Sequence, residues 1–301
     1  MRRTAVPLLL LASLAGCAGN GGRPKQVEPG TLAAALARPG PDVAAVQGTS
    51  DYAVGPVRVT FLVVDRRARL VSRRRARFLV ARALGAKPLV TTTARLEPIG
   101  IPGRSEAATG GARSIYVARF HLAEPGKYTF VAQPLGAAIQ AVGNLQVARR
   151  PTAPAVGERA IPSRTPTLAS THGDLAALTT ATPPDRSLLR YSVADSLAAH
   201  VPFVLVFATP KFCTSRTCGP VVDVVRAVQR RFAGRGVRFI HVEIYSDNNP
   251  AQGQNRWVRE WRLPSEPWVF VVGHDGRIKA RFEASVSVGE LAAAVRALVA
   301  R

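Results

Sequence analysis

The sequence predicts two domains, an N-terminal all-β sandwich over residues 51–148 and a C-terminal α/β domain over residues 186–301. Three observations support this division. The first region carries short runs of alternating apolar and polar residues, broken by glycine and proline, as antiparallel strands require. The second alternates apolar strand-like runs with amphipathic helical stretches. Between them, residues 149–185 are rich in proline and threonine and are predicted to be a linker.

The chain is long enough for two domains and is strongly basic. Its 301 residues carry a formal net charge of +22, and most of the cations are arginine. Such a charge favours anionic partners, among them lipid headgroups and cell-wall polyanions. The densest cluster, Arg66 to Arg77, is interrupted by apolar residues and has no nucleic-acid-binding motif beside it. We therefore expect a solvated surface there and no nucleic-acid partner.

The N-terminus has the pattern of a secretion signal. Two arginines precede an apolar run from Val6 to Leu14, which is too short to span a hydrocarbon core of about 30 Å. The run ends in Leu14-Ala15-Gly16-Cys17, which resembles the lipobox of bacterial lipoproteins. The resemblance implies a signal peptide over residues 1–16, cleavage before Cys17, and lipidation of the Cys17 thiol and amine by groups such as palmitate. An ordinary cleaved signal peptide is the alternative.

Both alternatives place the mature protein outside the cytoplasm, where disulfides persist. The lipoprotein interpretation anchors it on the extracytoplasmic face of the cell membrane through the lipid on Cys17. With Cys17 acylated, Cys213 and Cys218 are left as one pair. Residues 17–50 are rich in glycine, proline and alanine and are predicted to be a flexible tether.

Short strands are predicted throughout the N-terminal domain. Val59, Phe61 and Val63 alternate with their neighbours as in a half-buried strand. Similar strands are predicted at Arg77 to Ala81, Leu89 to Ala94, Ile115 to Leu122, Lys127 to Ala132 and Ala138 to Val147. About seven strands without a helical period argue for an antiparallel β-sandwich. The stretch from Tyr116 to Tyr128 resembles the late hairpin of bacterial immunoglobulin-like modules, which implies a fold and not a function.

Helix and strand signals alternate in the C-terminal domain. The predicted strands are Phe203 to Ala208, Val237 to Tyr245, Trp268 to Val272 and Ile278 to Phe282. The predicted helices begin after the capping residues Ser192 and Ser287, at Pro220, and at Asn255. The first strand is wholly apolar, as expected of a buried central strand.

Three features of this domain resemble the thioredoxin fold. Cys218-Gly219-Pro220 stands at a predicted helix start, like the front of the family's Trp-Cys-Gly-Pro-Cys motif. Pro267 immediately precedes the third strand, where the family places a cis-proline that faces the active site. A hairpin and a helix close the domain. The resemblance implies that Glu266, the residue before this proline, offers backbone groups to an extended substrate peptide.

The two cysteines have the chemistry that thiol–disulfide exchange needs. A thiol with a pKa of ~8.5 is mostly protonated at neutral pH, and a helix N-terminus stabilises its thiolate. Pro220 suits the first helical position, so we expect Cys218 at or just before the N-cap, with Lys211 and Arg216 adding positive charge nearby. Cys213 would then resolve the mixed disulfide.

The cysteine spacing departs from the family's pattern, which has two residues between its cysteines. Here four residues separate them, and Val221 occupies the place of the family's second cysteine. Aligning on the end of the preceding strand instead puts Cys213 at the nucleophile position. Either cysteine can therefore be the attacking thiol, and the helix-dipole argument favours Cys218.

One acidic group that the family carries near its site is missing here, and another acid is expected beside the cysteines. The buried acid that many thioredoxins carry before the motif is missing, because Val206 and Phe207 occupy that region. The Glu266 carboxylate is expected near the cysteines, where it would raise their pKa or act as an acid–base group. His241 and Glu243 lie on one face of a predicted strand and are interpreted as packing rather than as a metal pair.

The leading interpretation is a membrane-anchored extracytoplasmic thiol–disulfide oxidoreductase that acts on protein thiols or disulfides through Cys213 and Cys218. It requires no cofactor and no metal. The redox partner and the direction of exchange are not written in the sequence, because both depend on reduction potential. A second interpretation is a non-catalytic thioredoxin-like binding module with a structural disulfide.

Two further alternatives come from other thioredoxin-like families. Sco-type copper carriers combine a cysteine pair with a histidine, for which His241 and His274 are the nearby candidates, although neither stands in a matching motif. Peroxiredoxins combine proline, threonine and cysteine, and Pro210, Thr214 and Cys218 resemble that set with one residue too many.

Overall fold

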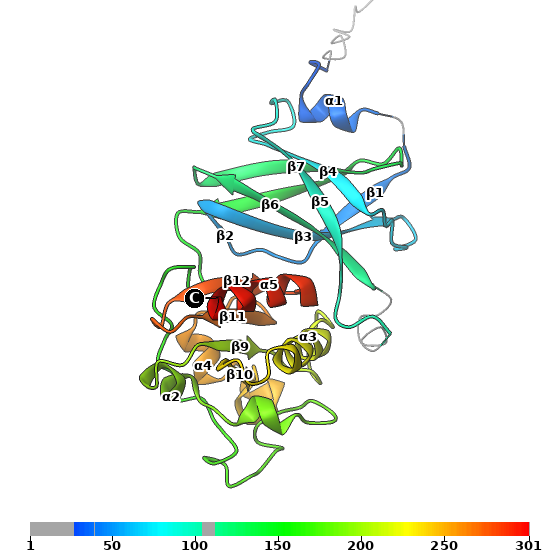
Figure 1. The fold of residues 1–301 in the computed structure, drawn as a ribbon. Coiled ribbons are helices and arrows are strands. Elements are labelled where there is room, and N and C mark those ends of the chain that lie inside the picture. The colour runs from blue at the N-terminus through cyan, green and yellow to red at the C-terminus, as the bar shows by residue number, and fades with distance from the viewer. Residues whose placement is uncertain (1–26, 39, 104–111, 301) are drawn as a thin grey trace, which may run out of the picture.

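The computed structural model describes residues 27–38, 40–103 and 112–300 (Figure 1). An eight-stranded sheet, formed by the N-terminal half of the chain, lies against a C-terminal unit with a four-stranded sheet and flanking helices. The predicted signal peptide and Cys17 lie outside the described residues, so the lipoprotein interpretation stays a prediction. No helix in the described ranges combines the length and the apolar character needed to cross a bilayer.

The N-terminal sheet follows the alternation of apolar residues seen in the sequence. Its strands are β1 (Val43–Gln47), β2 (Tyr52–Ala53), β3 (Gly55–Asp65), β4 (Arg75–Ala81), β5 (Val90–Pro98), β6 (Ser114–Leu122), β7 (Gly126–Pro134) and β8 (Ala141–Ala148). Their order is β1-β3-β6-β5-β4-β7-β8-β2, and only the β2–β8 pair is parallel. Val59, Phe61 and Val63 are buried, as predicted.

The eight strands form one sheet and not the two packed sheets of the predicted sandwich. β5 is hydrogen-bonded to both β4 and β6, so the ladder continues where a sandwich would divide into two layers. The sheet curls, which brings β1 beside β8 and encloses an aromatic core that includes Phe61, Phe78 and Phe130. The resemblance to an immunoglobulin-like module stays a prediction.

Part of the predicted tether is folded. The described residues between 27 and 50 include helix α1 (Leu32–Leu36), capped by Thr31, and strand β1, which pairs with β3. Leu32 is fully buried against Leu79 and Val131 of the sheet. The apolar residues within this glycine- and proline-rich stretch therefore anchor it, and the folded unit begins upstream of the predicted residue 51.

The C-terminal unit has the predicted alternation of helices and strands. Its elements are η2 (Arg186–Leu189), α2 (Val193–Ala198), β9 (Phe203–Phe207), α3 (Cys218–Arg231), β10 (Arg238–Val242), η3 (Ser246–Asn248), η4 (Pro250–Gln252), α4 (Arg256–Glu260), β11 (Trp268–Val272), β12 (Ile278–Glu283) and α5 (Val288–Val299). Ser287 and Glu290 form the capping box predicted for the last helix.

The four strands of this unit are ordered β10-β9-β11-β12. β10 runs parallel to β9, whereas β11 is antiparallel to both β9 and β12. α3 and α5 pack on one face of the sheet, and α4 packs on the other. β9 is buried along its whole length, as its apolar sequence predicted.

The segment predicted to be a linker is also docked. Ala153 and Ala160 are buried on the α4 side of the C-terminal sheet. Gly157 and Ala160 donate backbone N–H groups to the carbonyls of Ile278 and Gly276, so this segment lies along the edge of β12. Proline content alone did not reveal this docking, because backbone hydrogen bonds to the edge of β12 leave no pattern in the side chains.

Two buried ion pairs join the two units. Arg58 on β3 donates to Glu290 of α5 at 3.0 Å, and Arg281 on β12 donates to Asp51 at 2.8 Å. Both carboxylate side chains are at most 6% exposed. Burial lowers the pKa of Arg58 to about 10, so this guanidinium remains charged at neutral pH.

Glu283 forms a third connection between the units. Its carboxylate accepts hydrogen bonds from the Ser50 N–H, the Ser50 hydroxyl and the Asp51 N–H, each at 2.9 Å. It also accepts from the Ser265 hydroxyl at 2.8 Å. Ser265 immediately precedes Glu266, so the interface continues into the loop that carries the predicted site.

Candidate functional site

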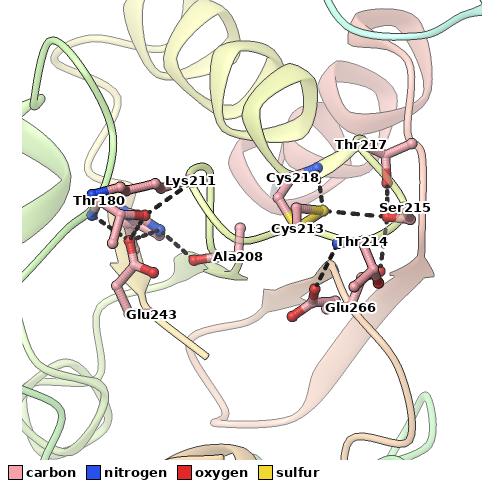
Figure 2. The surroundings of a disulfide bond; sticks show 11 residues. Thr180, Ala208, Lys211, Cys213, Thr214, Ser215, Thr217, Cys218, Glu243 and Glu266 are labelled. Carbon is pink, nitrogen blue, oxygen red and sulfur yellow. Dashed lines mark hydrogen bonds and ion pairs between the residues drawn. A yellow bond between two sulfur atoms is a disulfide. The ribbon is translucent and has the colours of Figure 1, made fainter. Parts of the chain in front are cut away.

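The predicted cysteine pair lies between the end of β9 and the start of α3. Cys213 and Cys218 are joined by a disulfide, with their Cα atoms 5.9 Å apart (Figure 2). The intervening residues turn sharply, and Arg216 adopts a left-handed backbone conformation with φ of 58°. This compact turn is what allows a spacing of four residues to close.

The sulfur of Cys213 lies at the N-terminus of α3. The helix begins at Cys218, and its N-cap residue Thr217 makes no side-chain capping hydrogen bond. The Cys218 N–H instead donates to the Cys213 Sγ at 3.2 Å. Pro220 was predicted to be the first helical residue, but it is the third. One of the N–H groups that a helix start leaves unpaired is thus directed at Cys213.

The two sulfurs differ in access to solvent. Cys213 is partly exposed, and its Sγ lies 3.3 Å from the Ser215 hydroxyl, which in turn contacts the Thr217 hydroxyl. Cys218 is 0% exposed and packs in the apolar core beneath α3. Within the disulfide, Cys213 is therefore the sulfur that a reaction partner can reach. The sequence analysis singled out neither Ser215 nor Thr217.

Glu266 lies beside both cysteines. The Glu266–Pro267 peptide bond is cis, as the resemblance implied. One carboxylate oxygen of Glu266 and the two sulfurs all lie within 4.8 Å of one another. The Thr214 N–H donates to this carboxylate at 3.4 Å, and the Ser215 hydroxyl contacts the Glu266 carbonyl at 3.4 Å (Figure 2). The loop that carries Glu266 is thus joined to the cysteine turn.

Burial raises the pKa of Glu266 above that of a free glutamate. The charge of Glu243 acts in the same direction, whereas the Thr214 N–H opposes the rise. A carboxyl whose pKa is raised keeps its proton to a higher pH, so it is suited to exchange a proton with a neighbouring thiol.

The two predicted cations lie at the surface of the turn. Lys211 is exposed, and its ammonium group lies 5.2 Å from the centre of the Phe212 ring. Arg216 is also exposed. Among the described contacts, neither cation bonds to a sulfur, so direct stabilisation of the thiolate comes from the Cys218 N–H.

A buried polar network lies next to the cysteine turn. Glu243, the residue after β10, accepts hydrogen bonds from the Thr180 N–H at 2.6 Å and from the Thr180 hydroxyl at 2.9 Å. The Thr180 hydroxyl also accepts from the Lys211 N–H at 3.2 Å. His241 contacts the Ala208 carbonyl at 3.0 Å. This network ties the docked segment and β10 to the loop that leads to Cys213.

His241 and Glu243 are both buried, and their interpretation as packing residues stays a prediction. The role of Thr180 was missed, because it lies more than sixty positions before Glu243 in a segment that the sequence predicted to be a linker. The other histidine considered for copper, His274, contacts the His200 carbonyl at 3.0 Å on the hairpin between β11 and β12.

A cavity of about 820 Å³ lies between the two units and reaches the cysteine turn. The N-terminal sheet contributes Val46, Thr49 and Ile115 to its wall, and the C-terminal unit contributes Ser215 and Glu266. Among the described residues that line it, the charged ones are the carboxylates Glu266 and Glu283. The described part of the wall thus carries no cation, although the chain has a net charge of +22.

Comparisons with known proteins gave matches among solved structures. No family model and no curated protein sequence matches the chain. Among solved structures, a thiol:disulfide interchange protein of the thioredoxin family from Chlorobium tepidum TLS is similar over 47% of this chain and 99% of its own. The two are 15% identical, with a TM-score of 0.29. A likeness of this extent assigns no function to the chain.

Proposed function

We propose that this protein is a thiol–disulfide oxidoreductase that acts on protein thiols or disulfides through Cys213 and Cys218. The observation that carries the proposal is the placement of Cys213. Its sulfur is partly exposed, receives a hydrogen bond from the first turn of α3, and is bonded to a neighbour that is fully buried. A pair of this kind has one thiol that can meet a substrate and one that can close the disulfide.

In this proposal Cys213 is the attacking thiol and Cys218 the resolving one. The reduced Cys213 thiolate attacks a substrate disulfide, forms a mixed disulfide and releases one substrate thiolate. The Cys218 thiolate then attacks the Cys213 sulfur, which breaks the mixed disulfide, releases the second substrate thiolate and forms the Cys213–Cys218 bond. This assignment reverses the preference for Cys218 in the sequence analysis, because the helix N–H is directed at Cys213 and Cys218 is buried.

Glu266 accepts the proton that Cys218 has to lose for the second step. Cys218 has to lose its proton in a buried environment, where a thiolate is disfavoured. The Glu266 carboxylate lies within 4.8 Å of both sulfurs and accepts that proton when ionised. In the reverse direction the carboxyl returns the proton to the departing Cys218 thiolate. The raised pKa of Glu266 lies closer to that of a thiol and favours such transfer.

We further propose that the reaction takes place on the extracytoplasmic face of the cell membrane, with the lipid on Cys17 as the anchor. The supporting observation is the N-terminal sequence, in which a short apolar run ends at Cys17. The net charge of +22 supports a location next to anionic lipid or cell-wall surfaces. Metabolic labelling with a radioactive fatty acid tests the anchor, and a Cys17→Ala variant should lose the label.

Single-cysteine variants test the redox assignment. The Cys218→Ser variant keeps the attacking thiol and should accumulate mixed disulfides with substrate proteins, which are visible as reducible adducts on a gel. The Cys213→Ser variant should form no adducts and show no exchange activity. Adducts on Cys218 but not on Cys213 would overturn the assignment of roles, and full activity of both variants would overturn the proposed function.

The burial of Cys218 also favours a second candidate, a binding module whose disulfide is structural. A structural disulfide is expected to have a reduction potential below about −300 mV and to resist the glutathione pool. Equilibration of the pair with dithiol buffers of defined potential separates the two candidates. The oxidoreductase proposal requires a potential within the range of thiol–disulfide exchange proteins.

A further inference from the structure

We propose that the reduced protein binds a zinc ion through Cys213, Cys218 and Glu266. This inference goes beyond the proposed function and depends on it only in requiring a reducible disulfide. The ligand atoms come from three places in the fold: the turn after β9, the first residue of α3, and the loop before β11. Figure 2 shows these side chains converging at the edge of the helix.

The spacing of the ligand atoms suits a tetrahedral metal ion. The two sulfurs and one Glu266 oxygen all lie within 4.8 Å of one another. Zinc bonds of about 2.3 Å to sulfur and about 2.0 Å to oxygen place tetrahedral ligands about 3.5–3.8 Å apart. Reduction releases the sulfurs from their covalent bond and lets them separate toward this distance. Metal binding therefore requires only a local adjustment of the turn.

The chemistry of the ligands selects the metal. Two thiolates and one carboxylate suit Zn²⁺, whereas Ca²⁺ and Mg²⁺ require oxygen ligands throughout. Neighbouring donors support the first ligand, because the Cys218 N–H donates to the Cys213 sulfur and the Ser215 hydroxyl lies 3.3 Å from it. Such outer contacts orient metal ligands and adjust their basicity.

One side of the proposed site borders the cavity between the two units. Ser215 and Glu266 both line this cavity, so water reaches the site. Three protein ligands and one exchangeable position are typical of zinc sites that bind or release another molecule. Bound zinc also holds both sulfurs and protects them from oxidation. The state of the disulfide therefore controls access of the metal.

The linked reaction requires a dithiol reductant as well as the zinc ion. A dithiol reductant supplies two electrons and two protons to the Cys213–Cys218 disulfide and is itself oxidised to a disulfide. The two resulting thiols release their protons to solvent as Zn²⁺ binds, since thiolates are the ligands. Zinc affinity should consequently rise with pH, and metal binding should favour the reduced protein.

The experiment uses the whole chain after reduction by a phosphine and removal of the reductant. Cobalt(II) serves as the spectroscopic probe, and zinc is measured by competition with a chromophoric chelator. We expect one metal ion per reduced chain, with a thiolate-to-cobalt charge-transfer band, and at least about 100-fold weaker binding by the oxidised chain. Glu266→Gln should weaken zinc binding by about 10- to 100-fold. Glu124→Gln, at an exposed carboxylate of the N-terminal sheet, is the matched control and should bind as the unaltered chain does.

Equal zinc affinity of the oxidised and reduced chains would overturn the inference, and so would an unchanged affinity of the Glu266→Gln variant. Circular dichroism of that variant verifies that it is folded. Exchange activity is measured in parallel with a chelator present. Exchange without zinc binding would refute this inference alone, whereas zinc binding without exchange would refute the proposed function alone.

Discussion

Replacement of Glu266 by glutamine should lower the pKa of the Cys213 thiol. An ionised carboxylate next to a sulfur disfavours the thiolate, and glutamine keeps the size of the side chain without its charge. At the 4.8 Å limit between these atoms, Coulomb's law gives about 1 kcal/mol in a water-like medium and about 3.5 kcal/mol at an effective dielectric constant of 20. Because both residues are partly exposed, we expect a fall of about one pH unit in the thiol pKa, which corresponds to roughly 1.4 kcal/mol.

The assay is the rate of alkylation of the reduced protein by iodoacetamide as a function of pH, with Cys17→Ala and Cys218→Ser as the common background so that only Cys213 reacts. The two curves should coincide below the pKa of Glu266, where its carboxyl is neutral, and diverge above it, where it is charged. Because burial raises that pKa, the divergence should begin at a higher pH than a free glutamate would give. Identical thiol pKa values with and without the carboxylate would refute the reasoning.

Three further predictions follow from the contacts described. Arg58→Met should lower the free energy of unfolding by about 3 kcal/mol. This value is at the lower end for breaking a buried ion pair, because Arg119 still contacts Glu290. Urea titration monitored by tryptophan fluorescence measures the loss of stability. Thr180→Val should cost about 1–3 kcal/mol by leaving the Glu243 carboxylate without hydroxyl support, and an equal stability in urea would contradict the importance of that network. The raised pKa of Glu266 means that the folded state binds the carboxyl proton more tightly than the unfolded state does. The contribution of this proton to stability should therefore be greatest at acidic pH and should decline as the pH rises above the pKa of a free glutamate. Thermal unfolding of Glu266→Gln and of the unaltered chain across pH tests the sign of this dependence.

Local patterns predicted the elements of the fold well. The alternation around Phe61, the apolar run before Ala208 and the Ser287 capping box each depend on residues close in sequence, and each was observed. The long-range arrangement was harder to predict. The continuous N-terminal sheet depends on which strands pair, and alternation of apolar residues does not specify a partner.

The site shows the same division. The cysteine pair was recognisable from a short sequence motif, and Pro267 was recognisable from its position immediately before a predicted strand. The helix-dipole argument favoured Cys218 as the attacking thiol, whereas we propose Cys213, because the helix begins at Cys218 itself and directs an N–H at Cys213. Thr180 could not be predicted, because its contact with Glu243 depends on how a proline-rich segment folds back over the sheet.

The contacts of the Glu283 carboxylate bear on whether the C-terminal unit can be produced as a separate fragment. A fragment that begins at residue 149 contains both cysteines and every strand of the four-stranded sheet, yet it lacks Ser50 and Asp51, which donate to Glu283, and Arg58, which neutralises Glu290. Such a fragment exposes an acidic surface next to the loop that carries Glu266. Truncation at the boundary between the two regions should therefore disturb the C-terminal unit. The N-terminal sheet and the cysteine pair should be expressed together in one chain.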